Sequence, residues 1–163
     1  MAKHLDAVAE ATREIDLLVL RLEEQGALNS QFKCVANLED ASAPNFATEV
    51  VELFLSNTDA NLGKVRALLD TDGPTDFDEV MKVLILMKGS NAIFGAAAMS
   101  EQCVRFVDSC NKCDEAGCLS ILEEQERALA SLKEQLHLFL ALDQKRKAAT
   151  QARDRGGGGP GSS

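Results

Sequence analysis

Apolar side chains recur every three or four residues along most of this chain, which is the spacing of one face of an α-helix. The pattern predicts helices over residues 5–24, 29–38, 44–70, 75–94, 100–111 and 115–149. Gly26 ends the first of these, and Pro44 suits the first turn of the third. Thr75 and Asp78 have the spacing of a capping box at the start of the fourth. Several amphipathic helices joined by short loops predict an all-α, up-and-down bundle.

The composition agrees with a helical core and narrows the range of partners. Of the 163 residues, 45% are apolar but only 4% are aromatic, which suits packed helices better than a β-sandwich. The formal net charge of −9 opposes binding to nucleic acid or to anionic membranes. No apolar run approaches the ~20 residues that span a bilayer. The first residues also lack the apolar core of a signal peptide.

Three regions are expected along the chain. Residues 1–27 are expected to form an N-terminal helix that packs on the bundle, and residues 28–149 the bundle domain itself. Residues 150–163 are expected to be a flexible tail, because their glycine-rich end cannot bury apolar surface.

The five cysteines raise a question of redox state and of metal binding. Their odd number, without a secretory signal, predicts reduced thiols in a cytosolic or nuclear protein. Cys110 and Cys113 have the spacing of zinc ligands, and Cys103 and Cys118 would have to complete the site. A predicted turn separates Cys118 from the others, so no metal is expected. A redox-sensitive pair of thiols remains an open alternative.

The helix over residues 75–94 is apolar on nearly every side between residues 83 and 87. Ile85 and Leu86 point roughly 130° away from the centre of its inward stripe, on opposite sides. Such a helix is either surrounded by others or presents an apolar patch to a partner. Lys88 borders the patch, and Gly89 would let another backbone come close, which favours a docking surface. The inward stripe consists of Phe77, Val80, Leu84, Met87 and Asn91.

Residues 87–96 resemble the signature of plant histidine-containing phosphotransfer proteins. They read Met-Lys-Gly-Ser-Asn-Ala-Ile-Phe-Gly-Ala, and the family motif reads His-Gln-Leu-Lys-Gly-Ser-Ser-x-x-Ile-Gly-Ala. Residues 43–46, 49–54, 103–106 and 115–119 are similar to the same family, in the same order and spacing. The resemblance covers about residues 28–142. It implies a four-helix bundle of the phosphotransfer type with additional N-terminal helices.

The chain departs from the family at the residue that carries the phosphoryl group. In the family a histidine lies three residues before the motif lysine, and here that position is Ile85. An alkyl side chain has no lone pair with which to accept a phosphoryl group. Neither His4, which precedes the resemblance, nor His137, which lies off the apolar stripe of the last helix, is expected to substitute. No catalytic residue is therefore expected.

The resemblance thus implies a pseudo-phosphotransfer protein without a cofactor. It would bind receiver domains of hybrid sensor kinases and of response regulators without accepting phosphate, as a negative regulator of cytokinin-type relays. A monomer in the cytoplasm and nucleus is expected. The alternative is an adaptor that binds an unrelated protein through the face over residues 81–92. The residues expected to contact the partner are Met81, Ile85, Leu86, Lys88, Gly89, Ser90 and Ala92.

Overall fold

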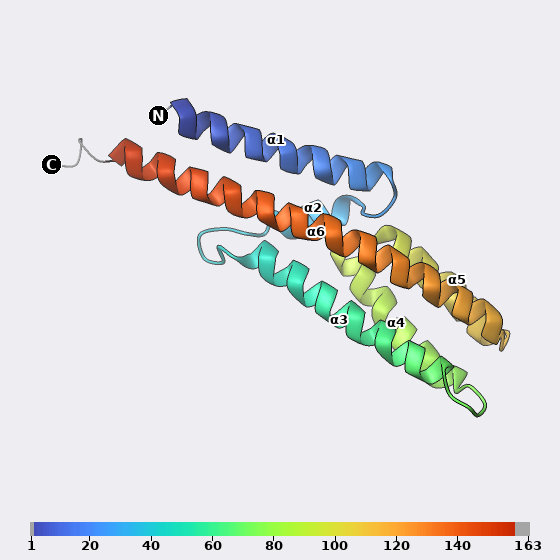
Figure 1. The fold of residues 1–163 in the computed structure, drawn as a ribbon. Helices are drawn as coiled ribbons and strands as arrows, with labels where there is room; N and C mark the ends of the chain where they lie inside the picture. Colours follow the sequence, from blue (N-terminus) through green and yellow to red (C-terminus); the bar gives the residue numbers. More distant parts are fainter. Residues whose placement is uncertain (1, 159–163) are drawn as a thin grey trace. The chain divides into compact units, whose positions relative to one another are not determined.

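A computed structural model of the chain describes residues 2–158, and all regular secondary structure in that range is helical (Figure 1). The expected all-α fold is confirmed. The helices are α1 (Ala2–Glu24), α2 (Ser30–Ala36), α3 (Phe46–Leu69), α4 (Phe77–Phe94), α5 (Ala97–Asn111) and α6 (Glu115–Gly158).

The described residues form two compact units. The larger unit spans residues 22–133, and the smaller one combines the described parts of residues 1–21 and 134–163. The division into regions 1–27, 28–149 and 150–163 stays a prediction. In the larger unit α4 packs against α2, α3 and α5. Arg66 of α3 binds Glu126 of α6 through two hydrogen bonds from its guanidinium group, which ties those helices together. The most deeply buried side chains of the larger unit include Phe32, Val65, Val80, Leu84, Met87, Phe106 and Leu122.

The start of α4 differs from the sequence prediction by one residue. Asp76, not Thr75, is the N-cap, and its carboxylate accepts a hydrogen bond of 3.2 Å from the backbone N–H of Glu79. A carboxylate is favoured there because it interacts well with the positive end of the helix dipole. Thr75 instead donates its hydroxyl hydrogen to Glu115 at the start of α6. The predicted capping box is therefore wrong.

The end of α6 lies further along than expected. The sequence placed the end of this helix at Ala149, but it continues to Gly158, so the described part of the region 150–163 is helical. Residues 144–153 are mostly glutamine, lysine, arginine and alanine, which are strong helix formers, and a glycine costs only about 1 kcal/mol relative to alanine. The rest of the expected tail, residues 159–163, lies outside the described residues.

The turn between α4 and α5 is shorter than the gap over residues 95–99 that the predicted helices left. Gly95 ends α4 with a φ of 95°, in the left-handed region, and α5 begins at Ala97. The backbone N–H of Asn29 donates a hydrogen bond of 2.9 Å to the carbonyl of Gly95, which brings the start of α2 against this turn. A Cβ atom at position 95 would lie only 2.5 Å from the backbone nitrogen of Phe32. Both the φ angle and the close approach therefore require glycine.

We expect the substitution Gly95→Ala to lower the free energy of unfolding by at least about 1–3 kcal/mol, the usual cost of a strained backbone conformation. The matched control is Gly63→Ala on α3, where a Cβ atom has no neighbour within 4 Å. That variant should gain about 1 kcal/mol of stability from helix propensity. Urea denaturation followed by circular dichroism measures both. Equal stabilities for the two variants would contradict the strained turn.

Candidate functional site

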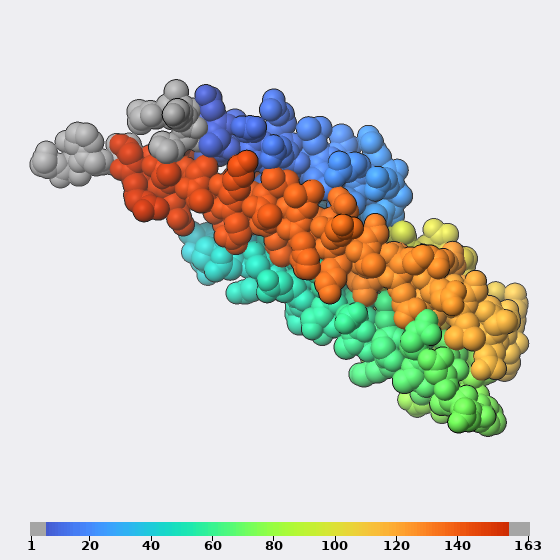
Figure 2. All heavy atoms as spheres, viewed as in Figure 1, coloured from blue at the N-terminus to red at the C-terminus, as the bar shows by residue number. Residues whose placement is uncertain are grey.

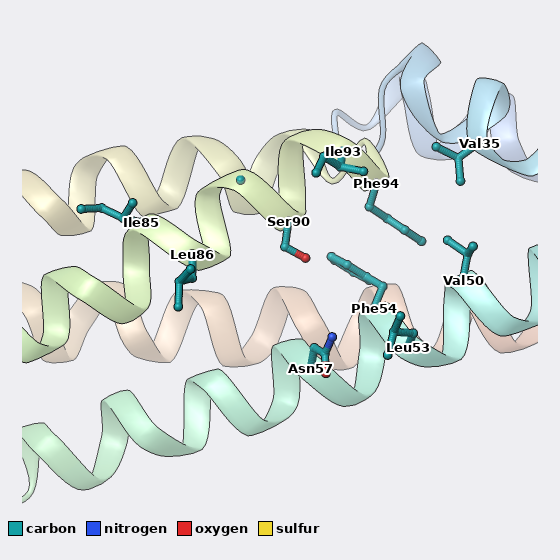
Figure 3. Close-up of a pocket in the computed structure, with 11 residues that line it drawn as sticks. Val35, Val50, Leu53, Phe54, Asn57, Ile85, Leu86, Ser90, Ile93 and Phe94 are labelled. Atoms are coloured by element: carbon teal, nitrogen blue, oxygen red, sulfur yellow. The ribbon is translucent and has the colours of Figure 1, made fainter.

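An apolar groove runs between α3 and α4, with one residue of α2 at its end (Figure 3). Its volume is about 460 Å³, which is in the range of pockets that bind ligands. Most of its lining atoms are apolar, and Asn57 and Ser90 are its polar side chains. It is lined by Val35, Val50, Leu53, Phe54, Asn57, Ile85, Leu86, Gly89, Ser90, Ile93 and Phe94.

Two aromatic rings form the floor of this groove. Phe54 of α3 and Phe94 of α4 stack with 3.9 Å between ring centroids and 5° between ring planes. Phe32 of α2 lies 5.3 Å from Phe94 at an angle of 53°, on the buried side. All three are 4% exposed or less. Such aromatic contacts bury a large area and fix the rings in place, so the floor is rigid.

The rim of the groove is apolar and open to solvent. Ile85, Leu86 and Ile93 of α4 are 63%, 69% and 71% exposed, and Leu53 of α3 is 62% exposed. These values confirm that Ile85 and Leu86 point away from the core, as the helical angles predicted. Four large aliphatic side chains around one groove make a contiguous apolar surface, and such surfaces mark sites where a partner binds.

The groove contains some of the contact residues predicted from the sequence and excludes others. Ile85, Leu86, Gly89 and Ser90 line it, whereas Lys88 and Ala92 are exposed on α4 outside the lining and Met81 is half-buried. The list of receiver contacts as a whole stays a prediction. The lining residues that the sequence did not indicate are Val35, Val50, Leu53, Phe54, Asn57, Ile93 and Phe94.

The two lysines near the groove differ in their surroundings. Lys82 pairs with Glu79 on the same helix at 2.8 Å, and this hydrogen bond raises the pKa of Lys82. Lys88 is exposed, and no carboxylate of residues 2–158 forms an ion pair with it. Lys88 is therefore the cation on α4 that is available to an acidic partner.

Gly89 lies in the middle of α4 and is not required by the fold. A Cβ atom there would have no neighbour within 4 Å, in contrast to Gly95. Glycine inside a helix costs about 1 kcal/mol relative to alanine. Within the described chain nothing offsets this cost, so the reason for glycine is sought in a close approach by a partner.

The opposite side of α4 is fixed by buried polar groups. Asn91 and Gln125 both donate hydrogen bonds to the sulfur of Cys103, at 3.7 Å and 3.2 Å, and Gln125 also contacts the carbonyl of Met99 at 3.4 Å. These contacts link α4, α5 and α6. Burial raises the pKa of Cys103, so its thiol is neutral. We conclude that Cys103 is a structural residue that helps to hold α4 in register.

The other cysteines do not gather around a common centre with Cys103. The sulfur atoms of Cys110 and Cys118 lie 3.7 Å apart. Burial, and then the neighbouring Cys118, raises the pKa of Cys110 to about 12. Cys113 is exposed on the turn before α6, with a φ of 52°. Among the side chains that the structure describes, no three histidine, cysteine or acidic groups are placed to hold a metal ion.

No histidine is among the residues that line the groove in the described part of the chain. His137 is exposed on the part of α6 that belongs to the smaller unit. The side chain of His4 lies outside the described residues. In addition, none of the helices within residues 2–158 has the length and hydropathy of a bilayer-spanning segment.

The fold matches solved structures of plant phosphotransfer proteins. A putative histidine-containing phosphotransfer protein from rice superimposes with a TM-score of 0.79 at 28% identity, over 86% of this chain and 99% of that one. A histidine-containing phosphotransfer protein from maize gives 0.77 at 28% identity, over 83% and 98% of the two chains. The class of protein is thus a helical bundle of the histidine phosphotransfer type.

The sequences of characterised proteins agree with this class. This chain is 32% identical to pseudo histidine-containing phosphotransfer protein 2 of Oryza sativa over 130 residues, covering 80% of this chain and 85% of the relative. It is 30% identical to histidine-containing phosphotransfer protein 1 of the same species over 142 residues, covering 87% and 96%. No family model matches the chain. The chain belongs to the plant histidine-containing phosphotransfer protein family.

The exposed rim leads to a prediction about stability. Replacing Ile85 or Leu86 with glutamine should change the free energy of unfolding by no more than about 0.5 kcal/mol, because both side chains already face water. Leu84→Ala, at the fully buried neighbouring position, should cost about 2–5 kcal/mol. Urea denaturation compares the three variants. A large loss for Ile85→Gln would mean that this side chain is packed and not available to a partner.

Proposed function

We propose that this chain is a pseudo-phosphotransfer protein, which binds receiver domains through the α3–α4 groove and does not accept a phosphoryl group. One observation carries the proposal: Ile85, which the sequence resemblance aligns with the family's phosphoacceptor histidine, is exposed at the groove. Three of the relatives are themselves named pseudo histidine-containing phosphotransfer proteins, two from rice and one from Arabidopsis.

The chemistry at position 85 follows from the side chain. A histidine there would offer a ring nitrogen to the phosphorylated aspartate of a receiver, and isoleucine offers only C–H groups. The helix is continuous from Phe77 to Phe94, so Ile85 and Lys88, three residues apart, lie on adjacent positions of the same side. In the proposed function, Lys88 therefore lies beside a side chain that has no nitrogen to accept a phosphoryl group.

The groove supports docking by apolar contact. Burying an exposed aliphatic side chain contributes roughly 1.5–3 kcal/mol, so Ile85 and Leu86 together stabilise a complex appreciably. Lys88, which lies beside them without an ion-pair partner in the described chain, adds attraction toward the acidic phosphorylation site of a receiver. Gly89 lets the surface of the receiver approach α4 closely.

The proposed effect on signalling is competition. A chain that occupies a receiver without taking its phosphoryl group keeps that receiver from active phosphotransfer proteins, and so acts as a negative regulator of a cytokinin-type relay. The proposed site of action is the cytoplasm and nucleus, where thiols stay reduced, and the five cysteines without a disulfide support this proposal.

Phosphotransfer is tested directly. We expect that incubation with a receiver carrying radiolabelled phosphate leaves no acid-labile label on this chain, whereas an active phosphotransfer protein becomes labelled under the same conditions. The variant Ile85→His/Leu86→Gln introduces the histidine and the glutamine with which the family motif begins. It tests whether a histidine at position 85 can be labelled. Stoichiometric labelling of the unaltered chain would refute the proposal.

Binding is tested by calorimetric titration into an unphosphorylated plant receiver domain. We expect Gly89→Trp to weaken binding at least tenfold, because the indole blocks the approach to α4. The control Gly63→Trp places the same side chain on an exposed and equally uncrowded helical position outside the groove lining, and should bind normally. Equal affinities for the two variants would place docking elsewhere. Failure of several receivers to bind at all would favour an adaptor with a different partner.

A further inference from the structure

A second apolar surface lies in the smaller unit, apart from the groove. Leu17 and Leu20 of α1 are 58% and 49% exposed, and Leu138 of α6 is 44% exposed. Side chains of α1 and of the C-terminal half of α6 adjoin on the face seen in Figure 2. A shallow pocket of about 290 Å³ lies there, lined by Glu14, Leu17, Leu18, Arg21, Leu138 and Leu142.

The exposed leucines cannot belong to the core of this unit. The buried residues of α1 are Ala11, Ile15, Leu18, Val19 and Leu22, and Leu17 and Leu20 fall outside this stripe. A second stripe on α1 has steps of four, three and four residues. It consists of Arg13, Leu17, Leu20 and Glu24. This is the spacing of the contact seam between two packed helices, with two leucines at its centre and charges at its ends.

We propose that a second copy of this chain covers this surface, with the two α1 helices packed antiparallel about a two-fold axis. In that arrangement Leu17 contacts the partner's Leu20, and Leu20 contacts the partner's Leu17. The ends of the seam then bring Arg13 opposite the partner's Glu24. The symmetry repeats each contact, so the surface is complementary to itself.

The charges beside the seam select the antiparallel direction. Glu14 and Arg21 flank the leucines on the side of the pocket, and in an antiparallel pair Glu14 lies next to the partner's Arg21, twice. A parallel pair would place the seam charges Arg13 and Glu24 against their own copies. The guanidinium group of Arg21 donates one hydrogen bond, of 3.2 Å, to Gln135 and has further N–H groups for the partner.

The far side of the seam limits the strength of the dimer. There Asp16 lies next to the partner's Glu23, which is a pair of like charges. The contact is also small, so we expect half-dimerisation between about 10 µM and 1 mM. The net charge of −9 opposes association in general, but at about 0.15 M salt the repulsion is screened beyond roughly 8 Å. This proposal replaces the monomer expected from the sequence.

Sedimentation equilibrium of the full chain at that salt concentration tests the proposal. The average mass should rise with concentration from 17.5 kDa toward twice that value. A mass that stays at 17.5 kDa up to 1 mM would overturn the proposal, and so would growth beyond the dimer, because an antiparallel pair is closed. Leu17→Gln and Leu20→Gln, both at exposed positions, should each abolish the dimer with the helix content unchanged.

Charge reversal tests the register. Glu14→Arg and Arg21→Glu should each weaken the dimer roughly tenfold or more, because two attractive pairs become repulsive. An equimolar mixture of the two variants should associate again, since each mixed pair unites opposite charges. Asp16→Lys should strengthen the dimer. Glu52→Arg and Lys64→Glu on α3 make the same changes of net charge outside this surface and should have no effect. If the mixture does not recover association, the antiparallel pairing is wrong.

Discussion

The turn at Gly95 determines where the residues of the groove lie. Its left-handed backbone ends α4, and its carbonyl holds the backbone of Asn29 at the start of α2. The preceding residue, Phe94, is thereby fixed between Phe32 and Phe54, at the point where α2, α3 and α4 meet. Because α4 is continuous back to Phe77, fixing its end also fixes the positions of Ile85 and Leu86 along the groove.

Much of this arrangement could be predicted from local pattern. The angle of 100° per residue was sufficient to place Ile85 and Leu86 outside the core, and the periodicity located the helices that the structure describes within residues 2–158. The two errors in helix ends arose where neighbouring residues compete to cap or to extend a helix. Asp76 is a better cap than Thr75 because it carries a charge, and the helix formers before the glycines extended α6 to Gly158.

The α3 half of the groove could not be predicted in this way. Leu53 and Phe54 are adjacent apolar residues of α3, yet they are 62% and 4% exposed. Which of them faces the core depends on how α3 crosses α4, and that crossing is set by side chains far apart in the chain. The same holds for Leu17 and Leu20. They can be recognised as an exposed apolar surface only when the structure shows which other residues of α1 are buried.

The side chains at positions 85 and 86 set the balance of forces at the groove. Contacts made by Ile85 and Leu86 depend on buried apolar area, which moderate salt hardly alters. The attraction exerted by exposed Lys88 is screened by salt. An isoleucine that desolvates acidic groups of a receiver also leaves them without a hydrogen-bond donor. The groove therefore favours an apolar surface of a partner over its acidic groups. In the proposed function this preference suits a relay antagonist, which would have to occupy a receiver and would have no need to contact the phosphoryl group.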